Sequence, residues 1–147
     1  MKLSNEIFFA EVERLLAAGE QVSILVKGLS MTPLLRNGRD KAILRQATES
    51  DIRVGEVLLF RYRGTHVLHR VIKIKGETIT FAGDGNYKIR EQATRNDVVG
   101  VMIATERASG RRVECTSRRW RWQSALWLAL PAIVRRVILG IRRRLIA

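Results

Sequence analysis

The stretch EVLLFRYRGTHVLHRVIKIK, residues 56–75, decides the fold of this chain. Its two halves, Glu56–Tyr62 and His66–Lys75, are rich in Val, Ile, Leu and aromatic residues, which favour β-strands. Arg63-Gly64-Thr65 between them is typical of a tight turn, so the stretch predicts a β-hairpin. The same criteria predict further β segments at Val22–Lys27, Lys41–Leu44, Thr78–Ala82 and Val98–Glu106.

Helical patterns flank this β-rich region. The apolar residues of Asn5–Ala18 share one stripe, and Gly19 is a natural helix stop. Beyond Ser109-Gly110 the composition shifts toward Arg and Trp. We therefore expect a mainly β (α+β) protein with an N-terminal amphipathic helix in residues 1–20, a β-rich domain in residues 21–115 and a basic helical tail in residues 116–147.

The C-terminal tail is strongly basic. The chain has a formal net charge of +13, and from Arg111 to the end ten Arg face one acid, Glu114. In Ala132–Ile146 apolar residues form one helix face and Arg the other, which is typical of a helix that lies on an anionic membrane. The alternative is a helix that docks on the β domain with its Arg face in water. The membrane interpretation assigns surface contacts to Trp120, Trp122, Trp127, Arg135, Arg136, Arg142 and Arg143, with nucleic acid as a less favoured partner.

Composition argues against several other classes of site. Cys115 is the lone cysteine, so no intrachain disulfide can form, and no Cys/His cluster has zinc spacing. We expect no metal and no cofactor. Charged residues interrupt the apolar N-terminus, so we expect no signal peptide. We also expect no clear transmembrane helix, because Gln123–Val134 is shorter than the roughly 20 residues of a membrane span. These features predict a location in the cytoplasm or on the inner face of the membrane.

A serine between two conformationally special residues is a candidate nucleophile. In Gly28-Leu29-Ser30-Met31-Thr32-Pro33, Gly28 permits unusual backbone angles, and Pro33 takes the following segment out of a strand ladder. A serine held in this way is exposed and rigidly placed, as a nucleophile must be. The alternative is a surface turn whose serine bonds only to backbone.

Five short boxes resemble, in the same order, those of the signal peptidase I superfamily, which includes the self-cleaving repressors of the LexA type. The boxes are Gly28–Pro33, extended by Leu35, Gly38 and Asp40, then Val54–Phe60, His69–Ile72, Gly83–Asn86 and Asp97–Val101. The resemblance covers roughly Val22 to Ala104. It implies a signal peptidase/LexA-like β-ribbon catalytic domain.

The resemblance also implies a serine peptidase site built on Ser30. Ser30 would attack the peptide carbonyl, and backbone N–H groups at Gly28 and Ser30 would form the oxyanion hole. Relatives usually have serine where this chain has Gly28, and they usually carry a transmembrane helix before the box. Met31 and Pro33 would contact the substrate.

The base implied by the resemblance is a histidine. His69 stands where most bacterial relatives have lysine, and so resembles the branch found in archaea, the endoplasmic reticulum and some spore-forming bacteria. His69 would take the proton of Ser30, and Asp84 would orient the imidazole. This branch often has a second acid after the Gly-Asp-x-Asn motif, and here none precedes Glu91.

Other titratable residues in the same strand offer alternatives. His66 is three residues from His69, so strand alternation places it on the opposite face, and we interpret it as structural. Lys73 and Lys75 share the parity of His69, so a lysine base is an alternative, although each would need desolvation to be neutral near pH 7.

These residues predict an endopeptidase that cleaves a peptide or a precursor protein. The resemblance implies a preference for small residues before the cut. One alternative is self-processing at Ala18-Gly19, as in the repressors. Another is a non-catalytic module that binds lipid or nucleic acid through the Arg/Trp tail on a peptidase scaffold.

Overall fold

A computed structural model of the chain describes residues 2–3, 6–25, 40–84, 86–116, 118–129 and 138. Several predicted site residues lie outside these ranges, namely Gly28, Ser30, Met31, Pro33, Arg135, Arg136, Arg142 and Arg143. Trp127 lies in a described helix, but its side chain is outside the description. The residues that the structure does describe include the whole predicted hairpin and the predicted base.

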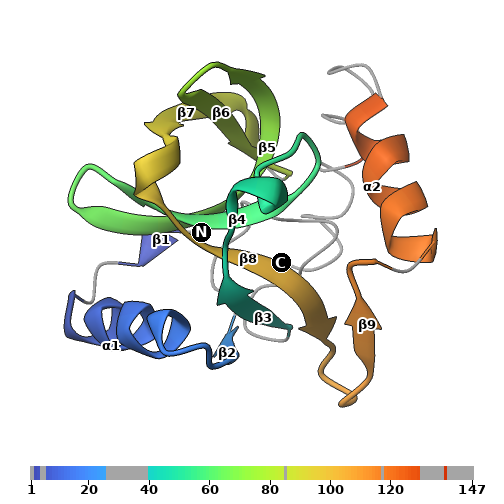
Figure 1. Ribbon diagram of the computed structural model, residues 1–147. Helices are drawn as coiled ribbons and strands as arrows, with labels where there is room; N and C mark the ends of the chain where they lie inside the picture. The colour runs from blue at the N-terminus through green and yellow to red at the C-terminus, as the bar shows by residue number, and fades with distance from the viewer. Residues whose placement is uncertain are drawn as a thin grey trace.

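The protein is mainly β, and its described strands form one antiparallel sheet (Figure 1). The strands are β1 (Lys2–Leu3), β2 (Val22–Leu25), β3 (Lys41–Gln46), β4 (Val57–Tyr62), β5 (Thr65–Lys75), β6 (Thr78–Gly83), β7 (Asn86–Thr94), β8 (Val98–Glu106) and β9 (Arg112–Glu114). Their order is β2-β3-β8-β4-β5-β6-β7, with β1 on β5 and β9 on β8. The other described elements are α1 (Glu6–Ala17), α2 (Arg118–Ala129) and the single 3₁₀ turns Glu49–Asp51 and Arg95–Asp97.

The predicted hairpin is confirmed as β4 and β5. Arg63 and Gly64 form a two-residue turn with positive φ values of 49° and 75°, which is the type I′ geometry that matches strand twist. The predicted helix and the other predicted β segments are also present, but β1, β7 and β9 were not predicted. Strand β7 has the polar sequence NYKIREQAT and owes its conformation to pairing with β6.

Helix α1 packs on the part of the sheet formed by β2, β3 and β8 (Figure 1). Its residues Phe9, Val12 and Leu16 are buried in an apolar cluster that also contains residues of these strands. Gly100 in β8 permits this approach, because a Cβ there would lie 3.1 Å from Leu16 Cδ1 and 3.2 Å from the Arg45 carbonyl oxygen. Helix α1 and the sheet therefore share one core.

A second apolar cluster lies inside the curl of β4 to β7. Figure 1 shows β5, β6 and β7 curling back over β4. Phe60 of β4 stacks on Phe81 of β6, with ring centroids 3.8 Å apart, although β5 separates the two strands in the sheet. This contact is possible only because the sheet coils, so the inner face of the curl is concave.

Helix α2 is the first helix of the predicted tail, and it packs against the core. Trp120 is only 4% exposed and packs in the same cluster as Cys115 and α1, whereas Trp122 is 68% exposed. The prediction of a membrane-surface role for Trp120 is therefore wrong, because its indole contributes to the core. The beginning of the predicted tail packs on the domain through Trp120. The predicted helix Ala132–Ile146, for which the membrane and docking alternatives were stated, lies outside the described residues apart from residue 138.

Candidate active site

His69 lies in the middle of β5 and faces the inside of the curl. Its cross-strand partner Leu58 and its neighbour Val71, two residues along the strand, both belong to the inner apolar cluster. His69 is 7% exposed. The predicted base is therefore held in an apolar environment by residues on two strands.

A carboxylate from β7 approaches this buried imidazole. Glu91 Oε1 lies 3.0 Å from His69 Nδ1, and both side chains are about 10% exposed or less. The contact does not meet the geometry of a hydrogen bond, and it becomes an ion pair only when His69 is protonated. In the part of the chain that the structure describes, His69 Nε2 has no hydrogen-bond partner. The ring thus presents one nitrogen to an acid and leaves the other available.

The curl of the sheet brings these two residues together. Val71, two residues along β5 from His69, pairs with Phe81 of β6, and Phe81 pairs with Glu91 of β7. Glu91 therefore lies two strands and two residues away from His69. In a flat sheet their Cα atoms would be about 12 Å apart. Coiling of β5 to β7 closes this gap on the concave face.

Burial controls the protonation of His69. Removal from water lowers the pKa of His69 below its ordinary value of 6.5, because the protonated ring loses its hydration. Contact with Glu91 opposes this shift by stabilising the charged form. The net direction is downward, so the imidazole stays neutral at slightly acidic pH and can accept a proton there.

This lowered pKa predicts a pH dependence of stability. The unfolded chain protonates this histidine near pH 6.5 and the folded chain only at lower pH, so the unfolded state binds more protons in between. The free energy of unfolding should therefore fall as the pH drops from 6.5 toward the folded pKa, by up to about 1.4 kcal/mol per pH unit from this group. Urea titrations between pH 7.5 and 5 would measure the fall.

The variant His69→Gln provides the control for this prediction. Glutamine does not titrate, so the stability of the wild-type protein relative to the variant should decline through the same pH window. Parallel curves for the two proteins would show that His69 titrates equally in the folded and unfolded chains, which would contradict the expected shift.

Asp84 contacts Arg70 in the described structure, and the acid that contacts His69 is Glu91. Both Asp84 oxygens accept hydrogen bonds from Arg70, at 2.8 Å from Nε and 2.7 Å from Nη2. Arg70 and His69 are neighbours in β5 and face opposite sides of the strand. Glu91 is therefore the described carboxylate next to the His69 ring, while the charge of Asp84 also raises the pKa of His69. The orienting role of Asp84 stays a prediction.

The buried Arg70–Asp84 pair fixes the surroundings of His69. Arg70 is fully buried and Asp84 is 3% exposed. The third bond of the guanidinium runs from Nη1 to the Gly55 carbonyl oxygen at 2.8 Å. Gly55 has a φ of 99°, and its N–H donates to the Val71 carbonyl oxygen. Arg70 thus ties the end of β6 and the turn before β4 to the strand that carries His69.

The second histidine serves the docking of α1. His66 faces away from the inner cluster, as predicted, and its ring stacks on Phe9 with centroids 4.5 Å apart. His66 Nε2 lies 2.6 Å from Glu13 Oε2, and Arg61 also binds the Glu13 carboxylate. These contacts support the structural interpretation of His66.

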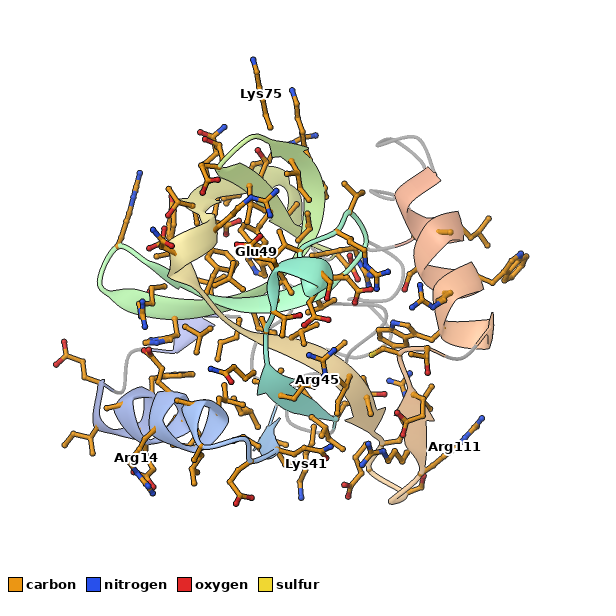
Figure 2. All side chains as sticks on the ribbon, in the orientation of Figure 1. Arg14, Lys41, Arg45, Glu49, Lys75 and Arg111 are labelled. Atoms are coloured by element: carbon orange, nitrogen blue, oxygen red, sulfur yellow. The ribbon has the colours of Figure 1, made fainter. Side chains whose placement is uncertain are left out.

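Neither lysine of β5 reaches the position of a base. A β-bulge between Val71 and Lys73 interrupts strand alternation, and both Val71 and Ile74 contact the inner cluster. Lys73 and Lys75 therefore face away from His69, contrary to the predicted parity. Both are exposed, and Lys75 projects outward at the end of the strand (Figure 2).

Cys115 is not a competing nucleophile. Burial raises the pKa of its thiol to about 12, because the thiolate would lose its hydration. In the described residues, no group of three or more His, Cys, Asp and Glu side chains is arranged to hold a metal ion.

The segment that carries Ser30 is anchored at both ends by described residues. It follows β2 and precedes β3, and Leu25 pairs with Lys41 where these strands meet. Asp40, which belongs to the extended first box, is 2% exposed and accepts a 2.6 Å hydrogen bond from Arg107. Ser30 itself lies outside the residues that the structure describes, so the structure defines no distance from Ser30 to His69.

The predicted self-processing bond lies in a folded helix cap. Ala18 and Gly19 follow α1, and Gly19 has a φ of 85°. The N–H groups of Ala18 and Gly19 donate to Arg14 and Leu16 carbonyl oxygens at 3.1 and 3.0 Å. A peptidase would have to unwind this cap to cut the bond, so the geometry does not favour this alternative.

Exposed apolar residues lie on the outer side of α2. Trp122 and Leu126 are four residues apart, share one helix face and are both exposed. None of the helices in the described residues is long and apolar enough to cross a membrane.

Comparison with known proteins adds no assignment, because no protein-family model and no curated protein matches the chain.

Proposed function

We propose that this chain is a serine endopeptidase of the signal-peptidase type, with Ser30 as nucleophile and His69 as general base. The observation that carries the proposal is the buried His69 imidazole, with Nδ1 against Glu91 and Nε2 unpartnered among the described residues. Imidazoles of serine peptidases use their two nitrogens in this way, one toward an acid and one toward the nucleophile. Catalytic contacts in ligand-free sites are often poorly aligned, as this one is.

The proposed reaction is acyl transfer in two steps. Ser30 Oγ attacks the peptide carbonyl carbon while His69 Nε2 takes its proton, and backbone N–H groups near Gly28 and Ser30 stabilise the oxyanion. The tetrahedral intermediate then expels the amine, which receives the proton from His69. Water hydrolyses the resulting ester with His69 again as base, which frees Ser30 and releases the carboxylic acid.

Glu91 is the positioning acid in this proposal. Its carboxylate stabilises the imidazolium that forms during each proton transfer and favours the tautomer with a proton on Nδ1. Asp84 acts indirectly, because it binds Arg70, and Arg70 also binds the Gly55 carbonyl oxygen in the turn before β4. These contacts link the end of β6 and the turn before β4 to the strand that carries His69. The pattern of boxes and this buried His–Glu pair are independent observations that support the same chemistry.

The proposed substrate is a peptide or precursor protein with small residues before the cut. This preference comes from the resemblance in the serine box. The proposed location is the cytoplasm or the inner face of the membrane. The exposed Trp122 and Leu126 support contact of the tail with an anionic membrane surface.

Cleavage of a peptide library tests the proposal. The purified chain and its Ser30→Ala variant would each be incubated with peptides that vary in the residues before the cut, and mass spectrometry would identify the products. We expect the wild-type protein to cut peptides with Ala or Gly before the cut and the variant to cut none. Equal cleavage by the two proteins, or cleavage by neither across the library, would count against the assignment.

A further inference from the structure

A basic cavity lies on the outer side of the curled strands. It has a volume of about 790 Å³ and is formed by the β4–β5 turn together with β5, β6 and β7. Its cationic lining residues are Arg61, Arg63, Lys73 and Arg90, and Thr80 and Gln92 add polar groups. Its volume is in the range of sites that bind small ligands.

This cavity is separate from the candidate active site. Arg90 and Gln92 flank Glu91 in β7, and alternation sends their side chains to the face opposite Glu91. Lys73, Thr80 and Gln92 pair directly across β5, β6 and β7, so they form one row on this outer face. The sheet itself therefore stands between the cavity and His69.

The cavity carries uncompensated positive charge. Arg61 is already paired with Glu13 of α1. Asp97, an acid in the lining, accepts hydrogen bonds from the Thr94 N–H and hydroxyl, which occupy one of its oxygens. In the described part of the chain no ion pair involves Arg63, Lys73 or Arg90. Asp97 is the one acid among the described lining residues, so Arg63, Lys73 and Arg90 leave the hollow with a net positive charge.

We propose that this cavity binds an acidic, extended segment of a protein partner. The row Lys73–Thr80–Gln92 spans about 10 Å across three strands, which matches about three residues of an extended peptide. Lys73 and Arg90 would pair with carboxylates, while the exposed Gln92 amide can bond to peptide groups. The proposal does not depend on the proposed peptidase function.

The lining favours a peptide over other anionic partners. Single-stranded nucleic acids bind by stacking bases on open aromatic rings. The aromatic ring in the lining is Tyr62, and the Arg63 guanidinium lies over its face at 5.1 Å from the centroid. A lipid bilayer can place a single headgroup in a basic hollow, whereas an extended peptide can bring several carboxylates and peptide groups along the polar row.

Fluorescence anisotropy with the full chain tests the proposal. The probe is a labelled octapeptide of alternating Glu and Ser, and a peptide with Gln for Glu is its neutral control. The variant Lys73→Gln/Arg90→Gln should bind the acidic probe about 25-fold more weakly at low salt, since each exposed charge pair contributes up to about fivefold. The matched variant Lys75→Gln/Arg111→Gln changes the same charge at exposed positions outside the lining (Figure 2) and should bind normally.

Two further probes, a thymidine oligonucleotide and phosphatidylglycerol vesicles, decide between partner classes. Weaker binding of both than of the acidic peptide, with loss of peptide binding only in the cavity variant, would support the proposal. Equal loss in the two variants, or no binding of the acidic peptide, would overturn it. Stronger binding of the oligonucleotide or the vesicles through Lys73 and Arg90 would also overturn it.

Discussion

Replacement of His69 by alanine is expected to lower kcat/KM for peptide cleavage by a factor on the order of 10⁶. The serine hydroxyl is a weak nucleophile, and without an adjacent base its proton has no acceptor in the buried site. Glu91→Gln should cause a smaller loss, on the order of 10⁴-fold, because the base remains but loses the acid that stabilises its charged form. Initial rates with the best peptide of the library, across pH 5 to 9, would measure both effects.

The pH profile separates a positioning role of Glu91 from a purely structural one. Contact with Glu91 raises the pKa of His69, so its removal should move the acidic limb of the profile to lower pH. The matched control is Glu77→Gln, which alters a highly exposed acid in the β5–β6 turn and should leave the rate unchanged within about twofold. Glu91→Gln with normal rates and an unmoved limb would show that Glu91 does not assist His69.

The fold could be predicted where strands bury apolar side chains. The strands β4, β5, β6 and β8 have frequent Val, Ile, Leu and aromatic residues, and all were located from the sequence. Strand β7 could not be located in this way, because its outer face carries Arg90 and Gln92 and its inner face carries the polar Glu91. Its conformation depends on pairing with β6, which is a tertiary contact.

The candidate site was predictable in its residue types but not in its pairing. His69 and Asp84 stand in motifs, whereas Glu91 has no local signal beyond its place after the Gly-Asp-x-Asn motif. Which acid meets the histidine depends on how the strands alternate and coil. Alternation sends Arg70 and His69 to opposite faces, so Asp84 and Glu91 serve different partners. The bulge after Val71 likewise removed Lys73 from the face of His69.

The largest effect on stability is expected from Asp84→Ala. This change leaves the fully buried Arg70 guanidinium without its paired carboxylate, so the free energy of unfolding should fall by about 3–5 kcal/mol. The variant Glu49→Ala breaks the exposed pair with Arg95 and should cost less than about 1 kcal/mol. Urea unfolding followed by circular dichroism would measure both changes.

A double variant tests whether the buried charge is the cause. If the unpaired guanidinium is what destabilises Asp84→Ala, then Arg70→Met in the same chain removes the charge and should recover a large part of the loss. Recovery should be incomplete, because methionine cannot donate to the Gly55 carbonyl oxygen as Arg70 does. A loss in Asp84→Ala no larger than that in Glu49→Ala would show that the pair does not hold β5, β6 and the Gly55 turn together. The positioning of His69 would then have to come from the apolar cluster and Glu91 alone.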